Sequence, residues 1–205
     1  MSMYPELDAL DLPGLQRAFD APPPDGDAHA AAWLLEVAGQ LAACGAEGIA
    51  FLRDRAASAD AEQRRAAMFG LASGPVEDPS LDALLVAALD DPAALVVAEA
   101  IDGLRYRDVT TATDRIEALL SHESGFVRGA VLRFVARCLP NRALPVLAAA
   151  ATDPDAVVRE NVADELDDLD DDRAVPILRA LATDPHSSVR EAAETALLHL
   201  TGHSA

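Results

Sequence analysis

The sequence predicts an all-α fold, an α-solenoid in which antiparallel helix pairs stack in chain order. A period of 31 residues is the first indication, because residues 153–159 (DPDAVVR) return in the same frame as residues 184–190 (DPHSSVR). A valine keeps this spacing through four repeats, at Val96, Val127, Val158 and Val189. Composition is the second indication: 51% of the 205 residues are hydrophobic, mainly Ala and Leu, and only 4% are aromatic. Ala and Leu favour closely packed helices, whereas a β fold would need more β-branched and aromatic residues.

The N-terminal part of the chain is predicted to precede the repeats. Residues 1–26 form an N-terminal segment with one or two short helices, broken at Pro13-Gly14, and end in a Pro-rich linker (APPPDG) that the prolines keep extended. Residues 27–45 form a capping helix that carries Trp33 on its apolar face. A solenoid needs such a cap because a terminal repeat otherwise exposes its stacking face. We therefore expect Trp33 to be a core residue.

Residues 46–205 are predicted to form the repeats as one continuous solenoid. The helix pairs are expected at about 46–74, 80–106, 111–138, 141–168 and 172–201, with second helices at about 93–106, 125–138, 156–168 and 187–200. Spacings of three and four residues place the apolar positions of each helix on one face. The expected core columns are Ala100, Val131, Val162 and Ala193; Leu104, Val135, Leu166 and Leu197; and, on the first helices, Ile116, Leu147 and Leu178.

An Asp-Pro turn joins the two helices of most repeats. Its aspartates are Asp91, Asp153 and Asp184. We expect each carboxylate to cap the next helix, with the following proline in the first helical turn, where the missing amide hydrogen costs nothing. The repeat over 111–138 has His122-Glu123 instead, which predicts a looser turn. Pro145 and Pro176 are interpreted as helix starts and not as kinks.

The motif D-P-x-x-x-V-R at the start of a second helix, repeated every 31 residues, resembles HEAT-like repeats. The short period is most similar to the variant first described in phycobilisome lyases. The resemblance covers about residues 46–201 and is strongest over 91–201. It implies a right-handed superhelix whose second helices line the concave face. It indicates a fold and not a function, because such repeats serve many roles.

The resemblance also implies a structural role for the repeated arginine, which in HEAT-like families commonly reaches the turn aspartate of a neighbouring unit. The expected ladder comprises Arg128, Arg159, Arg190, Asp153 and Asp184, with nearby turn carbonyls as further acceptors. Ligand binding by these arginines is the alternative. In the repeat over 80–106, Val97 stands in place of the arginine, so that repeat lacks one member of the ladder.

The chain is strongly acidic, with 35 acidic and 16 basic residues and a formal net charge of −19. Every basic residue is arginine, which is typical of a GC-rich bacterial genome. The charge argues against nucleic acid as a partner, because phosphate binding needs a basic stripe, and against an anionic membrane surface. A basic protein partner remains open.

The two cysteines and the first residues of the chain give an expectation of the cellular compartment. Cys44 and Cys138 lie about ninety residues apart in apolar helices, outside any C-x-x-C pair, and are expected to be buried thiols in a reducing compartment. The N-terminus lacks a basic and apolar leader, so we expect no signal peptide. No apolar run reaches ~18 residues, which predicts no membrane span. These features together favour a cytoplasmic location.

Three classes of enzyme built on HEAT-like repeats fit this sequence poorly. No chromophore-handling residue of the bilin lyases can be carried over. Deoxyhypusine hydroxylases carry recurrent His-Glu dyads for a di-iron centre, whereas this chain has one, His122-Glu123, and a binuclear site needs several convergent ligands. HEAT-like DNA glycosylases need a basic groove, and the face concerned is acidic or mixed here. We therefore expect no enzyme, no catalytic residue, no metal site and no cofactor.

The positions that point away from the core columns predict a protein-binding concave face. Its candidate residues are Asp102, Tyr106, Arg133, Arg137, Glu160, Asp164, Asp167 and Asp168. Three acids of this set, Asp164, Asp167 and Asp168, belong to the run 164–172, which holds seven acids in nine residues. Crowded acids repel one another, and the negative end of the helix dipole disfavours them further. A solvated face, a docking patch for a basic partner and a calcium site are the three interpretations.

The leading functional hypothesis is a non-enzymatic protein-binding scaffold that uses the concave, partly acidic face. A narrower form is an inhibitor that sequesters a basic toxin or nuclease, since the net charge of −19 would speed association. The alternative is an accessory subunit of a lyase or of a cofactor-attaching enzyme.

Overall fold

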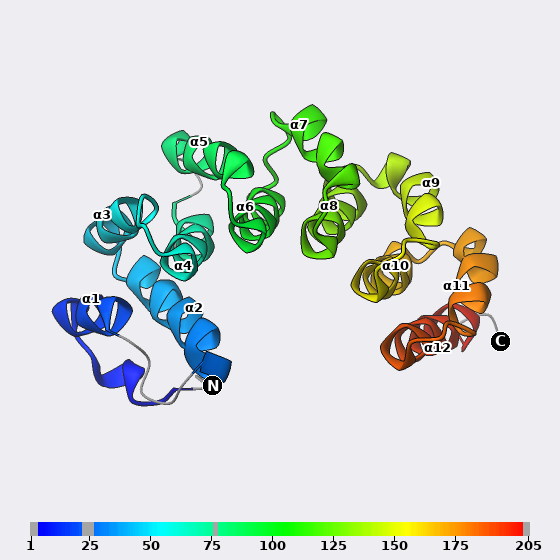
Figure 1. Ribbon diagram of the computed structural model, residues 1–205, viewed down its shortest axis with the longest axis horizontal. Coiled ribbons are helices and arrows are strands. Elements are labelled where there is room, and N and C mark those ends of the chain that lie inside the picture. The colour runs from blue at the N-terminus through cyan, green and yellow to red at the C-terminus, as the bar shows by residue number, and fades with distance from the viewer. Residues whose placement is uncertain (1–3, 22–26, 76–77, 203–205) are drawn as a thin grey trace. The chain divides into compact units, whose positions relative to one another are not determined.

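The computed structural model describes residues 4–21, 27–75 and 78–202 of the 205-residue chain. Every regular element among these residues is helical. The chain forms two compact units, which we call unit 1 (Met1–Val109) and unit 2 (Thr110–Ala205). Figure 1 shows that each unit consists of short helices joined by tight turns, in the order of the sequence. The predicted all-α fold of helix pairs is confirmed.

Unit 1 begins with two short elements that pack on a longer helix. Its elements are η1 (Leu7–Ala9), α1 (Leu12–Asp20), α2 (Asp27–Ala43), α3 (Ala46–Arg55), α4 (Ala61–Ala72), α5 (Pro79–Ala87), η2 (Ala88–Asp90) and α6 (Ala94–Tyr106). Pro13-Gly14 does not break a helix as predicted but lies in the first turn of α1, where Asp11 accepts a hydrogen bond from the Gly14 amide at 2.9 Å. The predicted linker over 22–26 lies outside the described residues.

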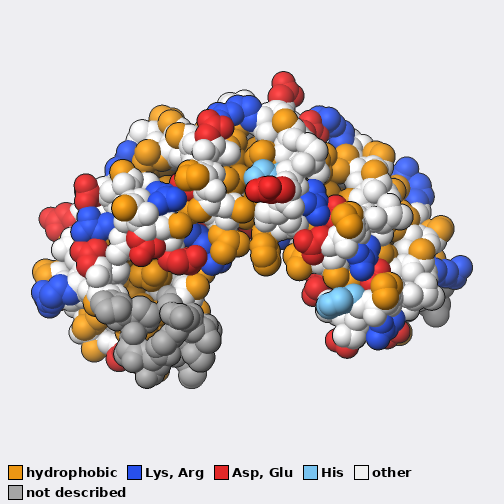
Figure 2. Space-filling model, viewed as in Figure 1, with side chains coloured by type: hydrophobic (Ala, Val, Ile, Leu, Met, Phe, Trp, Pro, Cys, Tyr) orange, Lys and Arg blue, Asp and Glu red, His pale blue; other side chains and the backbone are white. Residues whose placement is uncertain are grey.

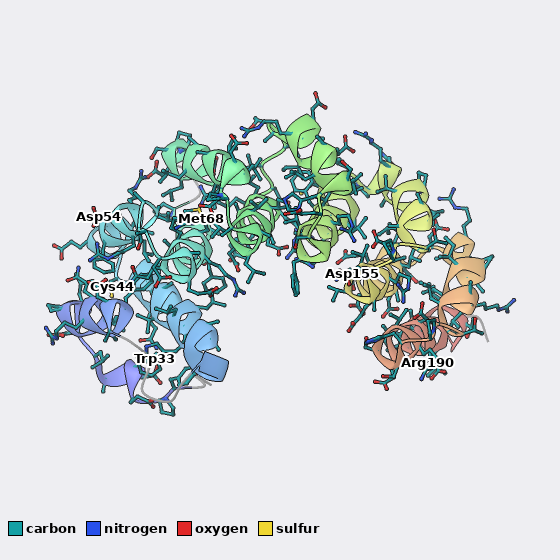
Figure 3. All side chains as sticks on the ribbon, in the orientation of Figure 1. Trp33, Cys44, Asp54, Met68, Asp155 and Arg190 are labelled. Carbon is teal, nitrogen blue, oxygen red and sulfur yellow. The ribbon has the colours of Figure 1, made fainter. Side chains whose placement is uncertain are left out.

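Trp33 belongs to the core of unit 1, as predicted. Its side chain is buried on α2, and its Nε1 donates to the carbonyl of Ala18 in α1 at 3.3 Å (Figure 3). The rings of Tyr4 and Trp33 pack edge to face, with their centroids 5.0 Å apart. This contact and α1 cover the start of α2, and α2 packs on α3 and α4.

Unit 2 has two layers of helices. Its elements are α7 (Thr113–Ala118), η3 (Leu119–Ser121), α8 (Gly125–Cys138), α9 (Pro140–Ala150), α10 (Ala156–Leu169), η4 (Asp172–Ala174), α11 (Val175–Leu181) and α12 (Ser187–Gly202). The second helices α8, α10 and α12 pack in that order to form one layer. The first helices α7, α9 and α11 form the other layer (Figure 1). Each helix begins or ends within a few residues of its predicted bound.

The predicted core columns are buried. Val131, Val162 and Ala193 are fully buried, as are Ile116, Leu147 and Leu178 on the first helices; in unit 1 the same holds for Ala100 and Leu104. One member departs from the prediction: Leu197, on the last helix that the structure describes, is only half-buried. The 31-residue period therefore marks the stacking core correctly.

The turn aspartates bind the backbone before the helix and do not cap its first turn as predicted. Asp91, Asp153 and Asp184 accept a hydrogen bond from the amide two residues on, at 2.8, 2.8 and 2.9 Å. That amide belongs to the residue just before the helix, so the carboxylate closes the turn and does not cap the helix. The following prolines precede the N-cap position and lie outside the first helical turn, where we had placed them. At α10 the cap is Asp155, which accepts from the Val157 amide at 3.0 Å (Figure 3).

The turn at His122 keeps the same form, against our expectation of a looser turn. Nδ1 of His122 accepts a hydrogen bond from the Ser124 amide at 3.0 Å. Its backbone angles (φ −63°, ψ 145°) nearly equal those of Asp91 (φ −65°, ψ 138°). The imidazole nitrogen therefore replaces the carboxylate oxygen as the acceptor.

Two further expectations are wrong in part. Pro176 lies in the first turn of α11, but Pro145 lies inside α9, because that helix begins at Pro140. A proline there has no amide hydrogen to donate to the carbonyl four residues earlier. Cys44 is exposed, because it lies in the turn after α2, and Cys138 is half-buried; the structure places neither in a disulfide. None of the helices in the described part of the chain combines the length and the apolar character that crossing a bilayer requires.

Asp170 occupies a backbone conformation that suits glycine. It ends α10 in the left-handed region, with φ 49° and ψ 47°. A side chain there costs about 1 kcal/mol, and a carboxylate also faces the negative end of the helix dipole. We expect Asp170→Gly to raise the free energy of unfolding by about 0.5–1 kcal/mol in urea denaturation. Asp172→Gly is the matched control, since Asp172 is not among the residues with positive φ; an equal gain in both variants would contradict the argument.

Candidate binding surface on the second helices of unit 2

The periodicity of α10 separates a buried face from an acidic one. Val158, Val162 and Leu166 recur every four residues and are buried. The predicted acids Glu160, Asp164, Asp167 and Asp168 occupy the positions between them and are half-buried or exposed. An α-helix with 3.6 residues per turn requires this separation. The four acids therefore share one side of α10.

Helix α12 contributes polar partners to two of these acids. The Ser188 hydroxyl donates to Glu160 Oε2 at 2.8 Å. Nδ1 of His199 lies 2.9 and 3.1 Å from the two carboxylate oxygens of Asp167. Asp164 and Asp168 are exposed beside these pairs. The surface thus extends over α10 and α12, and we call it the acidic surface, defined by Glu160, Asp164, Asp167 and Asp168.

The charges on this surface are poorly compensated at Asp164. Although the residue is exposed, partial desolvation of its carboxyl raises the pKa of Asp164. The neighbouring carboxylates of Glu160, Asp168 and Asp167 raise it further, while Arg133 acts in the opposite direction. The folded protein therefore holds this proton more tightly than the unfolded chain does. Ionisation of Asp164 at neutral pH opposes folding, and a cation bound at the surface would relieve that repulsion.

Two predicted arginines lie on α8, the neighbouring helix of unit 2. The Arg133 guanidinium donates to Oδ1 of Asn161 on α10, and Nδ2 of Asn161 donates to the Val157 carbonyl at 2.7 Å. Arg137 is exposed near the end of α8. Our sequence reasoning missed Asn161, although it is the one amide among Ala and Glu at its position in the second helices. Arg133 is thereby held beside the acids.

The remaining predicted residues belong to unit 1. Asp102 and Arg105 form an ion pair within α6, with 3.2 Å between Oδ1 and Nε. Tyr106, the last residue of α6, is 71% exposed. In unit 2 the large exposed apolar side chains are Phe126 on α8 and Leu198 on α12, and Leu198 is 72% exposed. Hydrophobic side chains are visible among acidic and basic ones on the face of each unit that Figure 2 shows.

The repeated arginines connect successive turns of unit 2. Both carboxylate oxygens of Asp153 accept from Arg128 at 2.7 and 2.8 Å, and both oxygens of Asp184 accept from Arg159 at 2.7 and 2.9 Å. Each arginine also donates to a carbonyl of its own turn. Arg190 lies on the last helix (Figure 3) and donates to the carbonyls of Asp184 and Pro185 at 2.7 and 3.0 Å.

Unit 1 has a further member of this ladder that the sequence reasoning missed. Arg64 on α4 donates to both carboxylate oxygens of Asp91 at 2.8 and 2.9 Å. It lies four residues after the N-cap Asp60, as Arg159 does after Asp155. Counting four residues from the N-cap would have found Arg64. The 31-residue period does not find it, because the connection between the repeats over 46–74 and 80–106 is longer than the later ones.

The ladder predicts a loss of stability in acid. Hydrogen bonds from Arg64 and Arg159 hold the pKa values of Asp91 and Asp184 below their usual range, and that of Asp184 falls to about 2. An unfolded aspartate titrates near ~3.9, so this stabilisation is complete above about pH 4 and is lost as the pH falls towards 2. We expect the difference in unfolding free energy between wild type and Asp184→Asn to shrink from pH 5 to pH 2 in urea titrations. A constant difference would contradict the pairing.

No metal centre is found in the part of the chain that the structure describes. Among residues 4–21, 27–75 and 78–202, no three or more His, Cys, Asp or Glu side chains are placed to hold a metal ion, and the run 164–172 is included. The acids of α10 face outwards along a helix, whereas calcium sites gather oxygens on a tight loop.

The fold and these contacts agree with the comparison to known families. The family model described as HEAT repeats matches residues 81–160 and 112–198, which together span more than half of the chain. The chain belongs to the HEAT-repeat family. The overlap of the two matches is expected for an array with a short internal period. A comparison with curated protein sequences finds no match.

Solved structures of repeat proteins resemble this HEAT-repeat chain in fold. The Escherichia coli protein YibA has a TM-score of 0.72 and 18% identity, covering 95% of this chain and 72% of its own. An engineered protein has a TM-score of 0.54 and 20% identity, with 92% and 96% covered. A designed armadillo repeat protein, solved in complex with the peptide (KR)4, has a TM-score of 0.52 and 18% identity, with 93% and 100% covered. These similarities show a helical-repeat scaffold.

Proposed function

We propose that this HEAT-repeat protein is a non-enzymatic scaffold that binds a basic segment of another protein on the acidic surface of α10 and α12. The clustering of Glu160, Asp164, Asp167 and Asp168 on one side of α10, with α12 packed beside it, is the observation that carries the proposal, and the raised pKa of Asp164 agrees with it. A lysine or arginine placed there gains attraction from several acids and removes repulsion that the free protein sustains. The net charge of −19 would also speed the capture of a basic protein, which suits sequestration or inhibition.

Two structural features support a segment over a small ligand. The acidic surface spans two packed helices, and the exposed side chain of Leu198 lies on the same helix as His199, next to it in sequence. An extended peptide can cover such a surface, with basic side chains over the acids and an apolar one at Leu198. The designed armadillo protein of similar fold, solved with an alternating Lys-Arg peptide, shows that helical repeats can present a surface to such a sequence.

The test is direct binding of fluorescein-labelled (Lys-Arg)4, followed by fluorescence anisotropy at ~50 mM and ~300 mM salt. We expect Asp164→Asn/Asp167→Asn/Asp168→Asn to weaken binding at least about tenfold at low salt, because exposed pairs each contribute a few tenths to 1 kcal/mol and act together here. Higher salt should reduce the affinity of the wild type more than that of the variant.

The matched control removes the same number of charges elsewhere. Glu47, Asp114 and Glu123 are exposed and lie outside the acidic surface. We expect Glu47→Gln/Asp114→Asn/Glu123→Gln to change the affinity by less than about twofold, because salt screens the attraction between the peptide and charges that it does not contact. Equal weakening in the two triple variants would reject the acidic surface and leave only non-specific attraction.

A further inference from the structure

Unit 1 has a groove between α2 and α4 that the proposed function does not use. Its volume is about 410 Å³, and its walls are mostly apolar. Helix α2 contributes Leu35, Glu36, Gly39 and Gln40, together with alanines, and α4 contributes Phe69. Phe69 is one of the few large hydrophobic side chains of the described residues that are exposed, at 37%. The groove can therefore take an apolar group the size of a side chain.

Gly39 keeps the floor of this groove open. It lies within the 17-residue helix α2, where glycine is less favourable than almost any other residue. It has no positive φ, and a Cβ added there would meet only Phe69 Cε1, at an ordinary 3.6 Å. At Gly48 and Gly70, in contrast, a Cβ would lie 1.8 Å from the Leu41 carbonyl oxygen and 2.6 Å from Leu52 Cδ1. Helix packing requires glycine at those two positions. At Gly39 it does not, and the missing side chain leaves the groove open.

Glu36 gives the groove a charge. It is the one ionisable residue among those that line it, and it is half-buried. Among the residues the structure describes, no arginine or histidine forms an ion pair with it, whereas the Gln40 amide beside it donates to Asp8 at 3.1 Å. A carboxylate at the edge of an apolar groove is complementary to a lysine or arginine that follows an apolar side chain.

We propose that this groove binds a partner segment in which one leucine-like side chain is flanked by lysine or arginine. The apolar side chain enters between Gly39 and Phe69, and the flanking cation pairs with Glu36. This site lies in unit 1 and does not depend on the acidic surface of unit 2. It adds sequence selectivity, because an apolar anchor in a pocket discriminates between basic segments of equal charge.

The test compares two fluorescein-labelled peptides, KRKRLKRKR and KRKRSKRKR, by anisotropy. On the wild type we expect the leucine peptide to bind about tenfold or more tightly, as burial of one leucine side chain allows. Gly39→Leu fills the groove from its floor and should abolish this preference while the melting temperature stays equal or rises, because leucine favours the helix. Ala50→Leu, at an exposed position of α3, is the matched control and should keep the preference.

The other outcomes separate the possible explanations. If Gly39→Leu fails to fold, Phe69→Ala must remove the preference instead. A preference that persists in either folded variant overturns the proposal, as does equal binding of both peptides to the wild type.

Glu36→Gln should weaken binding of the leucine peptide about threefold at low salt. Asp164→Asn/Asp167→Asn/Asp168→Asn should weaken the serine peptide, which has only the acidic surface to bind, and should leave the binding of the leucine peptide that Gly39→Leu removes. Failure of the acidic surface and failure of the groove are therefore distinguishable. A concentration-dependent dimer that Gly39→Leu abolishes would assign the groove to a second copy of the chain and overturn the proposal.

Discussion

Replacing Arg107 with methionine is expected to lower the free energy of unfolding by about 3–5 kcal/mol. The side chain of Arg107 is 2% exposed, the most buried guanidinium among the described ion pairs. Its Nε donates to Asp82 at 2.5 Å, and its terminal nitrogens donate to the carbonyls of Gly74 and Pro75 at 3.0 and 3.1 Å. Removing it takes the guanidinium from the Asp82 carboxylate and from the carbonyls of Gly74 and Pro75, and each buried group left unpaired costs about 1–3 kcal/mol.

The position of Arg107 explains why so many acceptors converge on it. It follows the last residue of α6, and the carbonyls it binds belong to the connection between α4 and α5. Within that connection the Asp78 amide donates to the Pro75 carbonyl at 3.2 Å, and Arg107 donates to the same carbonyl and to that of Gly74. Through these bonds and its pair with Asp82, Arg107 fixes the end of α6 against α5 and the turn before it.

The measurement is urea denaturation followed by far-ultraviolet circular dichroism. Arg107→Lys should be intermediate, because an ammonium group keeps the charge but lacks the planar fork that reaches several carbonyls at once. Arg173→Met is the control: its side chain is 76% exposed, and its ion pair is with Asp171, two residues away, so we expect almost no change in the free energy of unfolding. Similar losses for Arg107→Met and Arg173→Met would show that burial has no part in the effect.

Arg107 also marks a limit of the sequence argument. The stacking core follows from a repeating pattern, and columns such as Val131 and Val162 are buried as expected. Arg107 lies outside that pattern, in a connection that occurs once, and nothing in its neighbourhood distinguishes it from a surface arginine. A buried cation is revealed only by the acceptors around it, which lie about thirty residues away in the chain.

The candidate surfaces were accessible from sequence to different degrees. Helical periodicity placed Glu160 and Asp164 on one side of α10, because that requires only the helix and its core positions. Asp168 and His199 are 31 residues apart in the sequence, but the histidine lies against Asp167. The groove at Gly39 had no signal, because it arises from the packing of two helices in the part of the chain that precedes the regular repeats.

Replacing Arg159 with methionine is expected to lower the free energy of unfolding by about 2–3 kcal/mol, and Asp184→Asn by a similar amount. Both side chains are largely buried, at 13% and 7% exposed, and the guanidinium binds the carboxylate through two parallel hydrogen bonds. The double variant should cost less than the sum of the single ones, with a coupling of about 1.5–3 kcal/mol, because the second change removes a group that the first left unpaired.

The last repeat provides the internal control for this double-mutant cycle. Arg190 donates to turn carbonyls, and among the described residues, of which α12 is the last helix, it forms no pair with a carboxylate of a following turn. We therefore expect Arg190→Met to cost clearly less than Arg159→Met in the same urea titrations. If the ladder served a ligand and not the stacking of turns, the two arginines would be equally dispensable for stability and the coupling between Arg159 and Asp184 would be near zero. A large coupling and the order Arg159 above Arg190 follow only if each guanidinium joins its own turn to the next.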